Sequence, residues 1–213
     1  MPRSDPSEKT KTEILTAAVA LFKKKGWAHV SIEDVVKEVG VTRGAFYHYF
    51  KSREELIAAA TDKIFTDNNP FTAVSKEKGL NALERLRLIL KICVGETAAN
   101  AARSSEFLQA IENPVIFKSE FLSQINTIAP FFEELFVAGN KDGSLAVQHP
   151  KQAAQAFASL SNIWMTHDIS KISRQEFNDR ISFLGHMMDV LGVPFVNEEI
   201  KELTLGLYDK MHN

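Results

Sequence analysis

The stretch from Ser31 to Phe50, SIEDVVKEVGVTRGAFYHYF, constrains the fold of this chain more than any other. Ser31 followed three residues later by Asp34 forms a capping-box pattern, which predicts that a helix begins directly after Ser31. Gly40 can adopt the left-handed conformation that ends a helix, and Thr42 is an N-cap candidate for the next one. Two short helices joined by a glycine-containing turn are typical of a helix-turn-helix, whose second helix enters the major groove of DNA.

The second of these helices, from Thr42 to Phe50, presents two different faces. Helical periodicity places Phe46, Tyr49 and Phe50 on one inner side. The residues that gather on the opposite side are Arg43, Gly44, Tyr47 and His48. A purely structural surface more usually carries Glu, Lys or Ala, so this outward face favours contact with DNA.

Each residue type on this face suits a different part of a DNA groove. Arg43 suits a guanine edge, and Gly44 lets the backbone approach the groove floor closely. Tyr47 and His48 can donate hydrogen bonds to phosphates or pack on sugars and thymine methyl groups. Amide groups at the helix start beside Ser31 suit a phosphate, and the basic residues after the second helix suit the DNA backbone. The predicted DNA-binding residues are Ser31, Thr42, Arg43, Gly44, Tyr47, His48, Lys51 and Arg53.

A longer pattern surrounds this helix-turn-helix. It consists of Gly26-Trp27, the Ser31 cap, Gly40-Val41-Thr42 and the run from Tyr47 to Leu56. With this pattern, residues 12–57 resemble the DNA-binding domain of the TetR family of bacterial transcriptional regulators. The resemblance implies an all-helical homodimer with a variable C-terminal ligand-binding domain. It also implies that a small molecule bound in that domain releases the protein from a palindromic operator.

The rest of the chain predicts further helices and no strand, which places the fold in the all-α class. We expect a helix-turn-helix domain over residues 1–52, a connecting helix over 53–69, and a ligand-binding and dimerisation domain over 70–213. Within the last of these, we expect a long helix to begin between Lys76 and Leu80, and a turn across Gly139–Gly143.

The C-terminal part is rich in phenylalanine, most of which belongs in a core or a subunit interface. A minority of these aromatic side chains could line a pocket between helices, where bundles usually place ligands. The residues that we select for a ligand site are Phe107, Phe121, Trp164 and His167. The expected inducer is a small molecule that is at least partly apolar.

Two segments are candidates for a dimer interface, because the last two major helices of TetR-like subunits form a four-helix bundle. The matching segments here are residues 151–168 and 174–191. In the second segment, apolar residues alternate at spacings of 4 and 3 from Phe177 to Leu191. The alternative is burial of this stripe within the monomer, but a two-fold operator favours a two-fold protein.

Charge, cysteine content and hydropathy argue against a generally basic nucleic-acid binder, a disulfide-bonded secreted protein and a membrane-spanning protein. The net charge is −2, but residues 1–52 hold nine basic and six acidic residues, so a mildly basic head precedes an acidic body. The single cysteine, Cys93, lies in an apolar stripe, which predicts a core thiol and fits a reducing cytoplasm. No secretory signal and no run long enough to cross a bilayer is visible.

The sequence indicates no enzyme, no cofactor and no metal site. The pairs His186/Asp189 and His167/Asp168 lack a third ligand at a useful spacing. Three alternatives to a ligand-responsive repressor remain open. They are a constitutive regulator with no small-molecule ligand, a small-molecule carrier without DNA function, and a structural nucleoid protein.

Overall fold

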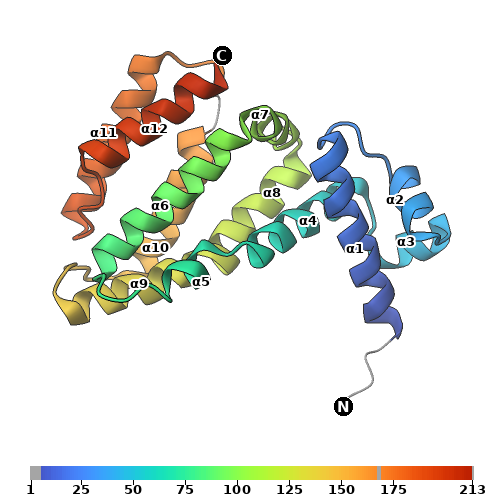
Figure 1. Ribbon diagram of the computed structural model, residues 1–213, viewed down its shortest axis with the longest axis horizontal. Coiled ribbons are helices and arrows are strands. Elements are labelled where there is room, and N and C mark those ends of the chain that lie inside the picture. The colour runs from blue at the N-terminus through green and yellow to red at the C-terminus, as the bar shows by residue number, and fades with distance from the viewer. Residues whose placement is uncertain (1–5, 167–168, 213) are drawn as a thin grey trace. The chain divides into compact units, whose positions relative to one another are not determined.

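Most helices in this chain begin directly after a residue whose side chain caps their first turn. Figure 1 shows the arrangement of the helices. The computed structural model describes residues 6–166 and 169–212, and over these residues it contains helices and no strand. The predicted all-α class is therefore confirmed. The α-helices are α1 (Pro6–Lys25), α2 (Ile32–Val39), α3 (Arg43–Tyr49), α4 (Arg53–Asp67), α5 (Pro70–Val74), α6 (Ala82–Ala99), α7 (Ala101–Ala110), α8 (Pro114–Ser123), α9 (Ala129–Asp142), α10 (Pro150–Ser159), α11 (Arg174–Val190) and α12 (Glu198–Met211).

The chain forms two compact units. The first contains the residues up to Asn68 together with Glu106–Glu120, and the second contains Asn69–Ser105 and Phe121–Asn213. The first unit thus includes the connecting helix α4 and also a segment from the middle of the chain. The functional division into DNA-binding, connecting and ligand-binding domains stays a prediction.

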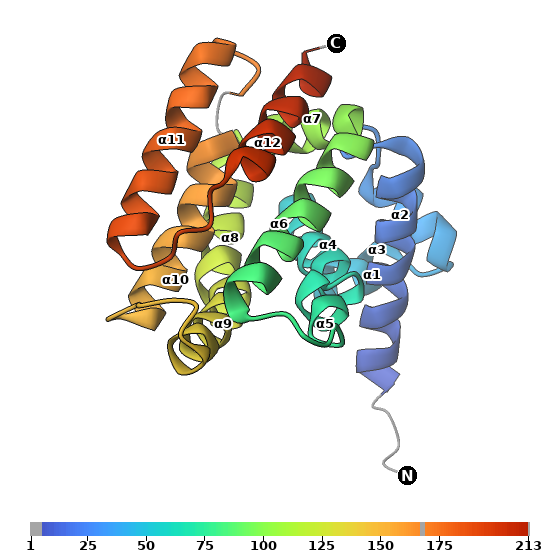
Figure 2. The same cartoon turned by 60° about the vertical axis from the view of Figure 1, so that its left-hand side comes forward.

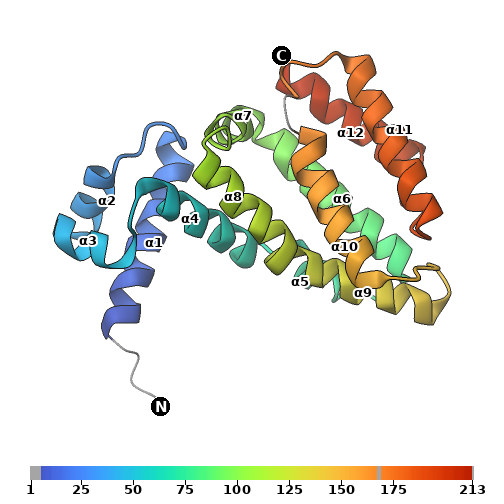
Figure 3. The same ribbon diagram turned by 180° about the vertical axis from the view of Figure 1, so that it is seen from behind.

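The first unit packs α1, α2, α3 and α4 around one apolar core. Figure 3 shows α2 and α3 beside α1, the arrangement of a helix-turn-helix domain. Phe46 and Phe50 of the predicted inner face are fully buried, as are Phe22 of α1 and Leu56 of α4. Ile111, which directly follows α7, and Ile116, in the first turn of α8, complete this core.

The second unit is a helical bundle with an aromatic centre. Figure 2 shows α12 lying along α6 and α11, and α10 packs against α9. Phe157 of α10 makes edge contacts with Phe132 of α9 and Phe195, with ring centroids 4.8 and 5.1 Å apart. Phe71 of α5 stacks on Phe131 at 5.0 Å. These rings hold distant parts of the chain in one core.

Two helical rods in the second unit contain π-helical turns, η1 (Gln124–Ile128) and η2 (Leu160–Trp164). Pro130 lies in the first turn of α9, directly after η1. The missing amide of proline costs nothing there, because the first-turn amides of a helix have no intrahelical partner. Each π-helical turn places one extra residue in its rod.

Three details of the second unit differ from the prediction. α6 begins at Ala82, because Asn81 and Glu84 form the capping box, rather than between Lys76 and Leu80. α9 continues through Gly139 to Asp142, so the expected turn begins only at Gly143. Leu145 packs against Gly139, where a Cβ atom would lie 2.5 Å from the leucine side chain.

Cys93 is exposed on α6 and is not the core thiol that the sequence predicted.

None of the helices in the described part of the chain is both long and apolar enough to cross a membrane.

Candidate nucleic-acid interface

A complete capping box fixes the start of α2. The Ser31 amide donates to Asp34 Oδ2 at 2.9 Å, and the Asp34 amide donates to Ser31 Oγ at 3.1 Å. The Ser31 hydroxyl donates to the same carboxylate at 2.6 Å. Lys25, at the end of α1, contacts Asp34 Oδ1 through its ammonium at 2.6 Å. The Lys25 ammonium and then the Ser31 hydroxyl and amide hold the pKa of Asp34 well below its usual range.

The turn between α2 and α3 has the conformation that the sequence predicted. Gly40 adopts a left-handed conformation with a φ of 76°, and its amide donates to the Val36 carbonyl at 3.0 Å. A side chain at this position would be strained, which explains the choice of glycine. Thr42 then caps α3 by accepting a hydrogen bond from the Ala45 amide at 3.1 Å. The turn therefore sets the direction in which α3 leaves the core.

The outward face of α3 is exposed as predicted. The side chain of Arg43 is 64% exposed and Tyr47 is 39% exposed, and Gly44 and His48 are also exposed. A Cβ atom on Gly44 would meet only Thr42 Oγ1, at 3.8 Å. The fold itself has room for alanine there, and alanine favours a helix by about 1 kcal/mol over glycine. The glycine is thus not explained by packing within the unit and suits close approach to another molecule.

Arg43 has a partner that the sequence did not indicate. Its Nη2 atom lies 2.8 Å from Glu33 Oε1, and both side chains are more than half exposed. An exposed ion pair of this kind contributes about 0–1 kcal/mol, so the guanidinium can exchange Glu33 for another acceptor at little cost. Glu33 lies ten positions earlier, beyond the reach of local helix patterns.

The two basic residues after α3 contact the protein itself. Lys51 Nζ donates to the carbonyls of Tyr47 and His48, at 3.1 and 3.4 Å, and so stabilises the end of α3. Arg53 donates from Nε to the Val30 carbonyl at 2.8 Å and from Nη2 to the Trp27 carbonyl. Arg53 thus ties the loop between α1 and α2 to α4. The phosphate contacts of Lys51 and Arg53 stay predictions.

The same loop is held from its other side by α7, a contact that the sequence did not predict. Glu106 Oε2 accepts a hydrogen bond from the Trp27 amide at 3.1 Å. The ring of Phe107 lies 5.1 Å from that of Trp27, which in turn stacks on Phe22 at 4.7 Å. These contacts and those of Arg53 keep the helix-turn-helix in one orientation within the first unit.

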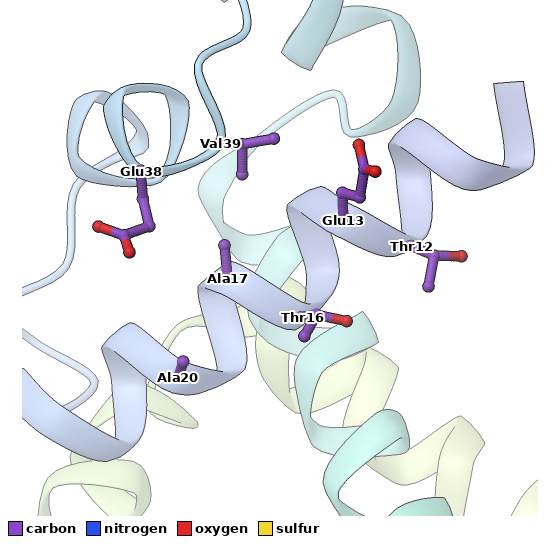
Figure 4. A pocket seen from close by; sticks show the side chains of 7 residues that line it. All are labelled: Thr12, Glu13, Thr16, Ala17, Ala20, Glu38 and Val39. Carbon is purple, nitrogen blue, oxygen red and sulfur yellow. The ribbon is translucent and has the colours of Figure 1, made fainter. Parts of the chain in front are cut away.

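A shallow groove of about 500 Å³ lies between α1 and α2 (Figure 4). Its floor contains Ala17 and Ala20, and Glu13 and Glu38 line it from the two helices. Two carboxylates disfavour a phosphate backbone, because like charges repel. This groove therefore does not extend the outward face of α3.

Comparison with known proteins identifies the first unit. Residues 14–60 match the family model described as bacterial regulatory proteins, tetR family. Residues 14–60 thus carry the DNA-binding domain of the TetR family. The match spans the region from the middle of α1 into α4, and so includes the capped turn and the whole of α3.

Curated relatives in the TetR family are transcriptional regulators. The chain is 28% identical over 156 residues to the transcriptional repressor KstR2 of Rhodococcus jostii, covering 67% of this chain and 72% of KstR2. It is 30% identical over 98 residues to the probable regulator ArpR of Pseudomonas putida, covering 46% of this chain and 47% of ArpR. The chain spans about half the length, or less, of the first curated relatives that it matches.

Solved structures of TetR regulators share the fold over most of the chain. The repressor QsdR of R. erythropolis aligns with a TM-score of 0.68 at 14% identity, covering 91% of this chain and 100% of QsdR. RolR in complex with resorcinol aligns with a TM-score of 0.62 at 20% identity, covering 93% of this chain and 94% of RolR. At these identities the likeness concerns the fold alone.

The four residues selected for a ligand site lie in different surroundings. Phe107 is part of the core of the first unit, against Trp27, and Phe121 is exposed on α8. Trp164 is half-buried at the end of η2, with its ring 5.9 Å from Phe183. His167 lies outside the described residues. Their role in ligand binding stays a prediction, and the described residues contain no cluster of three or more side chains suited to a metal ion.

The low pKa of Asp34 predicts an acid-sensitive contribution to the stability of α2. Because its folded pKa lies below the unfolded value near 3.8, the contribution is present at neutral pH and is lost as pH falls through the folded pKa. Asp34→Asn should lower the midpoint of thermal unfolding at pH 7, and this difference should shrink below about pH 4. Circular dichroism melts at pH 7, 5 and 3 measure it.

The matched control for this prediction is Glu38→Gln, which removes an exposed carboxylate from the same helix. This variant should melt like the unmodified protein. If Asp34→Asn lowered the midpoint of thermal unfolding equally at all three pH values, the shape of the side chain, and not its charge, would account for the effect.

Proposed function

We propose that this TetR-family protein is a ligand-responsive transcriptional repressor that binds a palindromic operator as a dimer. The observation that supports this most is the exposed face of Arg43, Gly44, Tyr47 and His48 on a capped helix with a buried inner side. The protein acts by binding, in the cytoplasm, and performs no catalysis.

In the proposed complex, α3 enters the major groove and its first turn faces base edges. Arg43 exchanges Glu33 for the O6 and N7 atoms of a guanine, a fork-like contact that arginine makes well. Gly44 allows the helix backbone to approach, and Tyr47 and His48 contact the sugar-phosphate chain or thymine methyl groups. The first amides of α2 beside Ser31, with Thr42 and Lys51, contact flanking phosphates.

The proposed dimer uses residues 151–168 and 174–191, of which 167–168 lie outside the described residues. α11 buries Ile181, Leu184 and Met188 within its own unit. Its other side exposes Phe183 and Val190, to 61% and 75%, two helical turns apart. Exposed apolar side chains of this size favour a protein partner, and a second copy of the chain supplies the two-fold symmetry that a palindrome requires.

The proposed inducer binds within the second unit and is small and partly apolar. Gln124 in η1 is only 2% exposed and accepts a hydrogen bond from Asn162 Nδ2 in η2 at 2.9 Å. Asn162 itself is exposed, but a buried amide such as that of Gln124 among apolar helices is the kind of group that orients a ligand in such a pocket. RolR, which shares the fold, is seen with the small aromatic molecule resorcinol. Inducer binding changes the spacing of the two recognition helices, with a coupling free energy of about 1–3 kcal/mol.

Fluorescence anisotropy tests this proposal with a labelled palindrome from the DNA that flanks the gene. At physiological salt, two protomers should bind each palindrome, and a shuffled duplex should compete about a thousandfold less well. Resorcinol and short alkyl compounds, titrated into the complex, test release.

Each alternative function predicts a different result in the same assay. Equal competition by the shuffled duplex would indicate a structural nucleoid protein. Specific binding to the palindrome that none of the compounds weakens would indicate a constitutive regulator. Ligand binding with no affinity for any duplex would indicate a carrier.

A further inference from the structure

We propose that a pocket between the start of α6 and the end of α9 binds a small organic carboxylate. The pocket has a volume of about 330 Å³ and lies entirely within the second unit. Its polar lining consists of Arg85, Lys141 and Asp142, and its apolar lining includes Leu80, Leu135 and Ala138. The site is separate from the outward face of α3 and from the polar pair of the π-helical turns. The inference therefore does not depend on the proposed regulatory function.

Arg85 carries an unsatisfied donor. Its Nε atom is buried and has no hydrogen-bond partner in the structure, and its Nη2 atom makes only a long contact of 3.3 Å with the Glu77 carbonyl. Buried polar groups are nearly always paired, so an unpaired guanidinium N–H calls for an acceptor. Nε and one Nη of arginine form a planar fork that matches the two oxygens of a carboxylate.

The neighbouring acid does not supply that acceptor. Asp142 Oδ2 accepts from the Ala82 amide and Oδ1 from the Ser144 amide, each at 2.9 Å. The Ser144 hydroxyl and amide, and then the Ala82 amide, hold the pKa of Asp142 below its usual value, so it is ionised and engaged in capping α6. Neither Arg85 nor Lys141 forms an ion pair within the described part of the chain. The charge of Arg85 also helps to lower the pKa of Asp142, but this carboxylate contacts neither cation of the pocket at ion-pair distance.

The apolar part of the lining limits the kind of anion. Leu80, Leu135 and Ala138 offer no hydrogen-bonding side chain, so an inorganic anion would leave them in contact with water. A carboxylate with a short hydrocarbon chain satisfies both parts of the lining, because its head pairs with Arg85 and its tail covers the leucines. A pocket of this volume matches ligands at the small end of the usual range.

Isothermal titration calorimetry of the full chain with three probes tests the inference. Hexanoate carries both features, 1-hexanol carries only the tail, and acetate carries only the charge. Hexanoate should bind at least about tenfold more tightly than either of the others, because a hydrogen bond to a charged group is lost in one case and apolar burial in the other. On the 1H–15N spectrum, hexanoate should shift the Arg85 Nε–H signal and 1-hexanol should not.

Three substitutions distinguish binding of hexanoate in this pocket from a general attraction of the anion to positive charges on the protein surface. Arg85→Gln should weaken hexanoate binding about tenfold and Lys141→Gln about threefold, while Lys210→Gln, at an exposed lysine on α12, should change nothing. Lys141 is exposed, so its variant should fold even if the Arg85 variant does not. Equal binding of hexanoate and 1-hexanol, or an unchanged affinity in Lys141→Gln together with an unshifted Arg85 signal, would overturn the proposal.

Discussion

The double substitution Arg43→Ala and Tyr47→Ala is expected to abolish binding to the operator duplex without lowering the midpoint of thermal unfolding. Both side chains are exposed on α3, and the one ion pair that is lost, between Arg43 and Glu33, is exposed as well. Alanine is also a better helix former than either residue. The fold should therefore tolerate the change.

The loss of DNA binding should be large because each change removes a contact that we propose for the complex with DNA. Replacing an arginine that forks onto a guanine costs about 1–3 kcal/mol at each half-site, and a dimer loses it twice. Loss of the Tyr47 hydroxyl, which has no hydrogen-bond partner within the described residues, adds to this. Together these losses exceed about a hundredfold in affinity.

Anisotropy titrations at fixed salt, with thermal melts of the same samples, measure both parts of this expectation. Lys210→Ala is the matched control, since it removes one positive charge from an exposed position on α12, outside the proposed DNA-binding and dimer segments. Unchanged operator affinity in the double variant would refute the placement of α3 in the groove. Equal weakening by Lys210→Ala would show that net charge alone governs binding.

Replacing Gly192 with alanine is expected to destabilise the second unit by about 2–3 kcal/mol. Gly192 follows α11 and has a φ of 85°, a left-handed conformation that costs an alanine about 1–2 kcal/mol. An added Cβ atom would also lie 2.2 Å from the Ala146 carbonyl oxygen. That backbone would have to move, which would strain the hydrogen bond from the Ala146 amide to the Gly192 carbonyl, now 3.0 Å long.

Substitutions at two other glycines separate the free-energy cost of a left-handed backbone conformation from the cost of a steric clash. Gly143 has a similar φ of 79° but nothing within 4 Å of an added Cβ atom, so Gly143→Ala should cost only about 1–2 kcal/mol. Gly95 lies within α6 with the same free space, and Gly95→Ala should stabilise the helix by up to about 1 kcal/mol.

Urea denaturation of the three glycine variants measures the order of their stabilities. Gly192→Ala should be the least stable, then Gly143→Ala, with Gly95→Ala above the unmodified protein. If Gly192→Ala and Gly143→Ala lost equal stability, the contact between Gly192 and Ala146 would have no energetic weight.

Much of the first unit was predictable because its signals are local. The Ser31 box, the left-handed Gly40 and the Thr42 cap each depend on residues within four positions of one another, and each is present. The two faces of α3 follow from helical spacing alone. Less was predictable in the second unit, where the apolar stripe that contains Cys93 suggested a core position and the structure exposes it.

The candidate sites divide in the same way. The residue types on α3 indicated DNA, but the contacts of Arg53 with Val30 and Trp27 connect positions more than twenty residues apart. No pattern in the sequence indicated that Glu33 pairs with Arg43, or that Arg85 has a buried Nε without an acceptor. Such partners depend on how helices pack, which no short pattern encodes.

The all-α class, the TetR-type helix-turn-helix and the outward face of α3 can be read from the sequence alone, because helical periodicity and capping depend on near neighbours. Which basic side chains already have a hydrogen-bond or ion-pair partner within the protein is visible only in the folded chain. Lys51 and Arg53 donate hydrogen bonds to backbone carbonyls. Arg43 forms an exposed ion pair with Glu33, which another acceptor can replace, and the buried Nε–H of Arg85 has no acceptor. The physical reason is that charge pairing depends on distances between residues far apart in the chain, and folding alone sets those distances.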